Sequence, residues 1–279
     1  MKARYVNPYT DFGFKKLFGE EANKDLLKDF LNELLPVQHK IVQLNFKNTE
    51  QWGAAAADRK AIFDIHCENA NGERFIIEMQ KAKIKFLKDR AMFYTTFPIR
   101  EQAEKGEWDF ELNPIYCVAI LDFKYDENRE KKDFIRNVQL KDQYCQVFYD
   151  KLTYVFIEMP RFTKEEHELE THFDKWLYFL KNLEDFENIP KILKEKIFEK
   201  AFHVAEIANF TPEQLAQYEE SLKNYRDLKG VVDTSYEEGK AEGIVEGKVE
   251  MAKKLKKEGI DIHIIAAASG LSEEEIEKL

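Results

Sequence analysis

Two carboxylates within residues 61–80, AIFDIHCENANGERFIIEMQ, are well placed for metal chemistry. Apolar and polar residues alternate on both sides of an Asn-Gly pair, a pattern that favours a β-hairpin. If Ile65 is paired with Ile77, Asp64 lies directly opposite Glu78, because side chains alternate between the two faces of a strand. Opposite Cβ atoms are about 4.5–5.5 Å apart, so the two carboxylates repel each other. Since Mg²⁺ prefers oxygen ligands, the pair predicts a divalent metal site.

The same register makes three further predictions about the hairpin. Gln80 shares the face of Glu78, where it could orient a water molecule. The loop contains three residues, 70–72, with Gly72 in the left-handed conformation. One core face holds six apolar residues: Phe63, Ile65, Cys67, Phe75, Ile77 and Met79. The alternative is a polar sheet face on which the carboxylates pair with basic side chains: Arg74, His66 or Lys60.

The hairpin lies among alternating helical and strand patterns. Thr10 is an N-cap candidate for a first helix, and a second helix over 21–35 should stop at Pro36. The remaining pattern predicts a strand over 40–47, a loop over 48–57, a helix over 85–105, and strands over 114–123, 135–139 and 151–158. A helix between the strands at 74–80 and 115–121 indicates a crossover connection. The predicted fold class is therefore α/β, with a mixed sheet flanked by helices and a helical C-terminal region.

We divide the chain into three parts: residues 1–160 with the mixed sheet, a helical extension over 161–230, and a charged, glycine-punctuated helical tail over 231–279. The tail repeats glycine every four residues, at Gly239, Gly243 and Gly247, which favours a loosely held helix or linker. Self-association through these C-terminal helices is the alternative. The end of the tail resembles a helix–turn–helix, but its second helix presents glutamates instead of DNA-reading side chains. This favours a packing or protein-interaction module.

Composition limits the class of protein. The net charge is −10, yet residues 1–100 hold 17 Lys and Arg against 13 Asp and Glu, so a nucleic-acid partner is not excluded. No run approaches the roughly 20 apolar residues of a membrane span, and the N-terminus lacks the apolar stretch of a secretory signal. The widely spaced cysteines (Cys67, Cys117 and Cys145) are expected to be reduced core thiols of a cytoplasmic protein, with no zinc site.

Residues 10–19 (TDFGFKKLFG), the hairpin and a following helix with Arg90 and Tyr94 resemble the PD-(D/E)xK nuclease family transposases, also called recombination-promoting nucleases. The resemblance covers about residues 7–160 and implies a restriction-endonuclease-like fold. Tyr94 lies one helical turn beyond Arg90, where packing is its alternative role.

Within this resemblance, Asp64 matches the metal-binding aspartate and Glu78 the glutamate of the second motif. Gln80 occupies the position of a superfamily lysine that is glutamine in this family. Asp11 matches the N-terminal aspartate and would approach the metal; its alternative role is to stabilise the start of a helix. Lys81, Lys83 or Lys85 could partly supply the missing charge, although strand alternation places Lys81 on the face opposite Gln80.

The resemblance implies a metal-dependent DNA endonuclease that aids recombination or element mobility. Asp64, Glu78 and Gln80 would be catalytic; Mg²⁺, or alternatively Mn²⁺, would be held by Asp64, Glu78 and Asp11. In the basic run over 81–90, the residues Lys85, Lys88 and Arg90 are candidate phosphate contacts, or a solvated helix face. The rival hypothesis is a non-catalytic interaction protein that retains the nuclease fold and self-associates through its tail.

Overall fold

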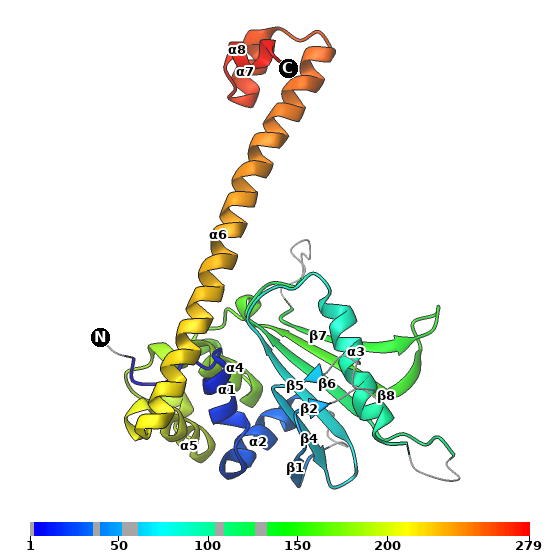
Figure 1. The fold of residues 1–279 in the computed structure, drawn as a ribbon, viewed down its shortest axis with the longest axis vertical. Coiled ribbons are helices and arrows are strands. Elements are labelled where there is room, and N and C mark those ends of the chain that lie inside the picture. Colours follow the sequence, from blue (N-terminus) through cyan, green and yellow to red (C-terminus); the bar gives the residue numbers. More distant parts are fainter. Residues whose placement is uncertain (1–2, 36–39, 52–60, 104–108, 126–132) are drawn as a thin grey trace. The chain divides into compact units, whose positions relative to one another are not determined.

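A computed structural model describes residues 3–35, 40–51, 61–103, 109–125 and 133–279 (Figure 1). The chain forms two units, Met1–Tyr225 and Arg226–Leu279. Lys60 and Pro36, and most of the predicted loop at 48–57, lie outside the described residues.

A mixed six-stranded sheet forms the centre of the first unit, in the order β1-β4-β5-β6-β8-β7. Its strands are β1 (Leu44–Phe46), β4 (Ile65–Asn69), β5 (Arg74–Gln80), β6 (Ile115–Leu121), β7 (Ile135–Lys141) and β8 (Val147–Glu158). β5, β6 and β8 run parallel, and the other neighbours are antiparallel. Helix α3 (Leu87–Arg100) connects β5 to the parallel β6. The predicted crossover and α/β fold class are therefore confirmed.

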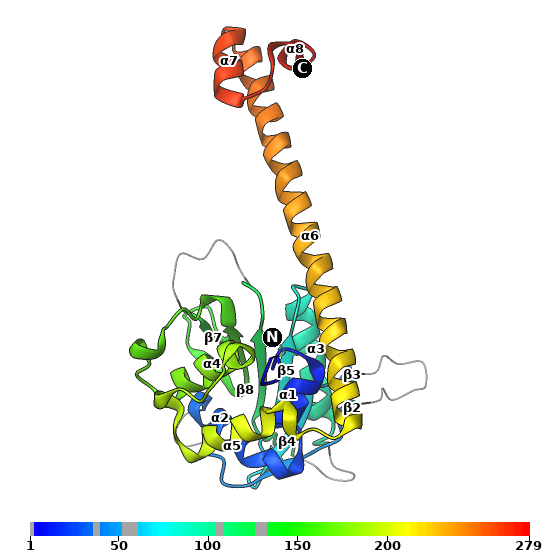
Figure 2. The same cartoon turned by 90° about the vertical axis from the view of Figure 1, so that its left-hand side faces the viewer.

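Helices cover both faces of the sheet (Figures 1 and 2). One face packs against helices from both ends of the unit: α1 (Asp11–Phe18), α2 (Lys24–Leu34), α4 (His172–Asn182) and α5 (Lys196–Ala205). The other face packs against α3. Thr10 caps α1 as predicted, because its Oγ1 accepts a hydrogen bond from the backbone N of Gly13 at 2.9 Å.

Short 3₁₀ helices complete the first unit: η1 (Glu21–Asn23), η3 (Met159–Arg161), η4 (Glu166–Glu168), η5 (Leu183–Asp185), η6 (Lys191–Leu193) and η7 (Ile207–Asn209). η1 occupies the start of the second predicted helix, so the α-helix itself begins only at Lys24.

The predicted hairpin register is confirmed along β4 and β5, where Ile65 pairs with Ile77. Gly72 has a φ of 78°, as its place in the three-residue loop requires. The prediction for Phe63 is wrong: its side chain joins the α3-side cluster, whereas the other five apolar residues pack on the opposite face. The cause is a change of partner, because the Phe63 backbone N donates to Thr49 O at 2.9 Å.

A second, two-stranded sheet accounts for this change of partner. β2 (Glu50–Gln51) pairs with β3 (Ala61–Ile62), and Ile62 lies opposite Glu50. The predicted hairpin register, continued to Ile62, would have placed it opposite Gln80, and that part of the register is wrong. The segment from residue 48 was predicted to be a loop, and β2 corrects that prediction. The chain bends at Asp64 between the two sheets, which places this side chain at the end of the main hairpin.

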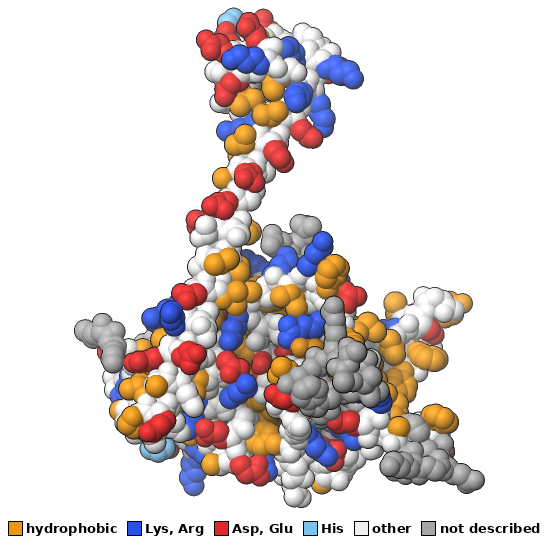
Figure 3. All heavy atoms as spheres, in the orientation of Figure 1, with side chains coloured by type: hydrophobic (Ala, Val, Ile, Leu, Met, Phe, Trp, Pro, Cys, Tyr) orange, Lys and Arg blue, Asp and Glu red, His pale blue; other side chains and the backbone are white. Residues whose placement is uncertain are grey.

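The β7–β8 hairpin extends beyond the rest of the sheet, since β6 pairs with β8 only from Leu152 onward. Exposed apolar side chains gather at its end (Figure 3). Phe148 in β8 is 80% exposed. Cys67 and Cys117 are buried as predicted, but Cys145 is exposed in the turn of this hairpin. The prediction is wrong for Cys145 because, in the part of the chain that the structure describes, nothing covers this end of the hairpin, and Tyr144 and Phe148 are exposed as well.

Helix α6 (Pro212–Lys257) begins in the first unit and continues into the second. In the second unit, α7 (Ile262–Ser269) and α8 (Glu273–Glu277) meet at Gly270, whose φ is 71°. Ala252, Ile265 and Ile276 form its small core. The two helices and the turn at Gly270 agree with the helix–turn–helix pattern at the end of the tail. The division of the chain at residues 160 and 230 stays a prediction. Among the described residues, no helix combines the length and apolar character needed to cross a bilayer.

Candidate active site

Asp64 and Glu78 meet where β4 begins and β5 ends. The bend at Asp64 turns its side chain toward β5, where Oδ2 accepts a hydrogen bond from the backbone N of Met79 at 2.7 Å. In return, the backbone N of Asp64 donates to Oε1 of Glu78 at 3.3 Å. Each carboxylate is thus fixed by the backbone of the opposite segment. The structure brings these two predicted residues together at the end of the hairpin.

Glu78 faces α3 and is almost fully buried. Gln80 shares this face, as predicted, and its Nε2 donates to Oε2 of Glu78 at 3.0 Å. Arg90 of α3 places Nη2 at 3.9 Å from the same Oε2, and its guanidinium lies 4.9 Å from the centre of the Tyr94 ring. Gln80 therefore orients the glutamate, and Tyr94 orients the arginine beside it.

The electrostatics of the pair favour a bound cation. Burial, and then the charge of Asp64, raise the pKa of Glu78 to about 8, against the opposing charge of Arg90. Burial also raises the pKa of Asp64, as does the charge of Asp11. A buried and a half-buried carboxylate that both have raised pKa values are stabilised by either a proton or a metal ion. Their oxygen donors suit Mg²⁺ or Mn²⁺, so these residues fit the predicted ion.

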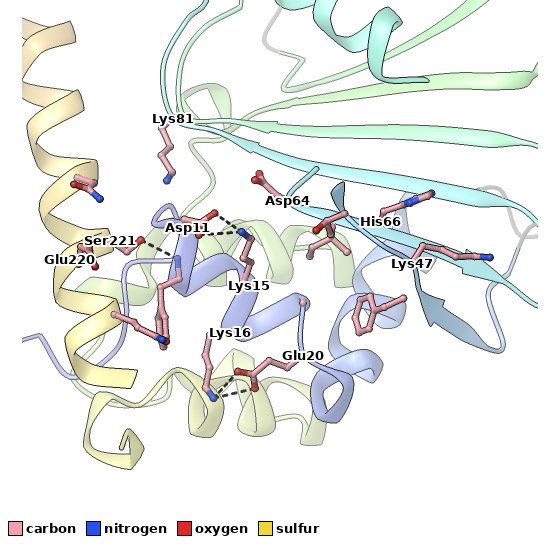
Figure 4. A pocket seen from close by; sticks show the side chains of 17 residues that line it. Asp11, Lys15, Lys16, Glu20, Lys47, Asp64, His66, Lys81, Glu220 and Ser221 are labelled. Carbon is pink, nitrogen blue, oxygen red and sulfur yellow. Dashed lines mark hydrogen bonds and ion pairs between the residues drawn. The ribbon is translucent and has the colours of Figure 1, made fainter. Parts of the chain in front are cut away.

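A cavity of about 790 Å³ opens beside Asp64 on the α1 side (Figure 4). Its walls come from α1, the segment around β1 and β4, the start of α6, and the residue after β5. The lining residues are Asp11, Phe12, Lys15, Lys16, Gly19, Glu20, Phe46, Lys47, Thr49, Asp64, Ile65, His66, Lys81, Gln217, Glu220, Ser221 and Asn224. Asp64 thus lies between this cavity on one side and the buried Glu78 on the other.

Asp11 occupies the first position of α1 and faces the same cavity as Asp64 (Figure 4). Its carboxylate forms an ion pair with Lys15 at 3.0 Å. Within the described ranges, no three His, Cys, Asp or Glu side chains converge closely enough to hold a metal ion together. Asp11 is therefore near the pair but is held by a lysine of its own helix.

The predicted phosphate-binding residues divide into two groups. Arg90 lies beside Glu78. The ammonium groups of Lys85 and Lys88 instead lie 5.4 Å from the ring centres of Phe86 and Tyr125, and neither residue lines the cavity.

Lys15 and Lys81 are the cations that face Asp64 across the cavity, and both lower the pKa of Asp64. Strand alternation placed Lys81 on the face of the sheet opposite Gln80. Asp64 opens onto this same face, so both residues line the cavity. Lys15, four residues after Asp11, has the spacing of a helical ion pair. No sequence pattern indicated Gln217 or Asn224, because α6 lies far along the chain.

Comparison with known proteins gives one result. The model of the PD-(D/E)XK nuclease family transposases matches residues 8–235, a range that includes every candidate residue named above. This match confirms the resemblance found in the sequence. No curated protein and no solved structure matches the chain significantly.

Proposed function

Since the chain belongs to the PD-(D/E)XK nuclease family transposases, we propose that it is a metal-dependent endonuclease that hydrolyses phosphodiester bonds of DNA. The observation that carries this proposal is the pair of the half-buried Asp64 and the buried Glu78 beside a lysine-containing cavity. Raised pKa values at both carboxylates favour a cation at this position, and the cavity of about 790 Å³ next to it is where we place the substrate strand.

Asp64 and Glu78 would hold the ion, with Mg²⁺ or Mn²⁺ as the candidates and Asp11 approaching from α1. When bound, the ion supplies the Lewis acid that polarises the scissile phosphate and acidifies a water molecule. Gln80 keeps the Glu78 carboxylate in one orientation through its 3.0 Å hydrogen bond. Because Glu78 has a pKa of about 8, it would give up a proton as the ion enters.

The basic residues would act on the substrate instead of the ion. Arg90 lies beside Glu78 and could contact the phosphate after the ion has taken over the carboxylate. Lys85 and Lys88 would meet phosphates farther along the strand. We assign the activity to recombination or element mobility in the cytoplasm, with self-association through the C-terminal helices.

Arg90 also favours a second candidate function. It supplies a positive charge 3.9 Å from Glu78 without any metal ion, and such a pair is compatible with a non-catalytic interaction protein that retains the nuclease fold. In that case the carboxylates would hold the structure together, and the tail would mediate assembly.

The test is cleavage of supercoiled plasmid by the purified full chain, with Mg²⁺, with Mn²⁺ and with EDTA. The variants are Asp64→Asn and Glu78→Gln, and the exposed Glu199→Gln serves as the matched control. We expect metal-dependent nicking that each site variant lowers by roughly 100-fold or more and that the control retains. Calorimetric titration with Mg²⁺ provides a second readout. No cleavage and no metal binding by the wild type would favour the interaction protein.

A further inference from the structure

The cavity beside Asp64 presents an electrostatic problem for an anionic strand. Asp11 and Asp64 both face it, so a phosphate that approaches Asp64 is repelled unless a cation meets it. Three of the lysines that line the cavity are already in ion pairs. Lys15 pairs with Asp11 at 3.0 Å, Lys16 with Glu20 at 3.0 Å and Lys47 with Glu68 at 3.1 Å.

Lys81 is the fourth lysine of the lining and differs from the other three. Within the described segments of the chain, the structure records no ion pair for it, and its side chain is half-buried. Its ammonium group points into the same space as the carboxylates of Asp11 and Asp64 (Figure 4).

The position of Lys81 follows from the backbone. Gln80, the last residue of β5, points to the α3 side with Glu78, so the next residue points to the α1 side. Asp64 opens onto that side because the chain bends there between β3 and β4. A two-sided arrangement results: the buried Glu78 and Gln80 lie on one side of Asp64, and the cation lies on the other.

We propose that Lys81 binds the phosphate of the strand to be cut and holds it next to Asp64. This proposal rests on the proposed nuclease function. The ammonium group offers three hydrogen-bond donors on a flexible stem, which suits the non-bridging oxygens of a phosphodiester. Negative charge grows on those oxygens during hydrolysis, so a cation fixed there stabilises the transition state more than the bound substrate.

The experiment compares the wild type with Lys81→Ala, Lys81→Arg and, as the matched control, Lys194→Ala, an exposed lysine that does not line the cavity. A short fluorescein-labelled DNA duplex is bound in EDTA at several salt concentrations and followed by anisotropy. Cleavage of the same duplex with Mg²⁺ gives kcat and KM separately. Thermal unfolding checks that each variant is folded.

We expect Lys81→Ala to reduce the slope of log K against log salt by about 1, because one phosphate contact is lost. Its kcat should fall by roughly 100-fold, as for other lost transition-state contacts. Lys81→Arg should retain the slope and recover part of kcat, and Lys194→Ala should retain both the slope and kcat of the wild type. A residue with a purely structural role would lower the melting temperature without moving the salt slope.

The two proposals fail in different ways. If the wild type cleaves and Lys81→Ala keeps both the slope and kcat, Lys81 does not bind the phosphate, and the nuclease function stands. If the wild type binds DNA without cleaving it and Lys81→Ala still lowers the slope, Lys81 binds phosphate, and the nuclease function fails. Absence of both DNA binding and cleavage in the wild type overturns both.

Discussion

Glu78 allows a quantitative test of the candidate site in the metal-free protein. Its side chain is 6% exposed, and its pKa is raised from 4.5 to about 8 by burial and then by Asp64. Because the folded protein holds a proton that the unfolded chain has lost, stability falls as the pH rises from about 4.5 to about 8. The proton belongs to the Asp64–Glu78 pair, since the two groups titrate together.

The size of the effect follows from the shift. Each unit of pKa corresponds to about 1.4 kcal/mol, so the span from 4.5 to about 8 gives a loss on the order of 5 kcal/mol by pH 8. Glu78→Gln removes this loss, because an amide is neutral at every pH. One of the two donors to Glu78, Asp64 N or Gln80 Nε2, would then face an NH₂ group, which costs about 1–2 kcal/mol. The variant should therefore be slightly less stable near pH 5 and more stable by roughly 3 kcal/mol at pH 8.

Urea unfolding in EDTA, followed by tryptophan fluorescence from pH 5 to pH 8, measures this difference. In a first unit of this size, 1 kcal/mol shifts the melting temperature by about 2–4 °C, so thermal scans provide a second readout. Glu199→Gln is the same change at an exposed position. Its free energy of unfolding should differ little from that of the wild type, and the sign of the difference should not change between pH 5 and pH 8. If the difference between Glu78→Gln and the wild type stays constant over this range, the raised pKa is refuted. Adding Mg²⁺ should favour the wild type, because binding stabilises only the folded protein with both carboxylates.

Three further predictions concern stability elsewhere in the chain. His172 of α4 lies 2.6 Å from Asp29 of α2 and 3.3 Å from Glu195, and the hydrogen bond to Asp29 raises its pKa. The protonated His172 stabilises the folded protein fully below its ordinary pKa of about 6.5, and this stabilisation is lost as the pH rises through the raised pKa. Relative to the wild type, His172→Ala should therefore lower the free energy of unfolding by about 1 kcal/mol more at pH 6 than at pH 9, measured by urea unfolding. A decrease that does not depend on pH would contradict this prediction. Gly72→Ala places a Cβ at a φ of 78° and 2.7 Å from an asparagine amide, so it should cost about 1–2 kcal/mol by the same assay, and a wild-type midpoint would refute the strain. Gly243→Ala in α6 meets no atom within 4 Å and should stabilise the helix by about 1 kcal/mol, seen as a higher thermal midpoint in circular dichroism; an unchanged or lower midpoint would show that the glycine is needed there.

The sequence predicted the hairpin and its carboxylate pair because both depend on local patterns. Alternation fixed the pairing of Ile65 with Ile77, and the loop needed a residue that tolerates positive φ, which Gly72 supplies. The opening helix was also local, since Thr10 caps it through its own side chain. The family match over residues 8–235 agrees with the motif that these residues form.

Other features of the site depended on partners that are distant in sequence. Phe63 was assigned to the wrong face because the chain exchanges its hairpin partner for β2 just before Asp64. No local pattern records that exchange. In the same way, Cys145 was expected to be a core thiol, yet it lies at a hairpin end that no other described segment covers.

The sequence by itself predicted that Asp64 and Glu78 come together, because each lies next to one member of the Ile65–Ile77 pair of the same hairpin. Only the tertiary structure decided what surrounds them. Arg90 reaches Glu78 because α3 packs on that face, while Lys81 and Asp64 share a cavity whose walls include α1 and the start of α6. The raised pKa of Glu78 arises from burial under these elements, and burial depends on how the whole first unit packs.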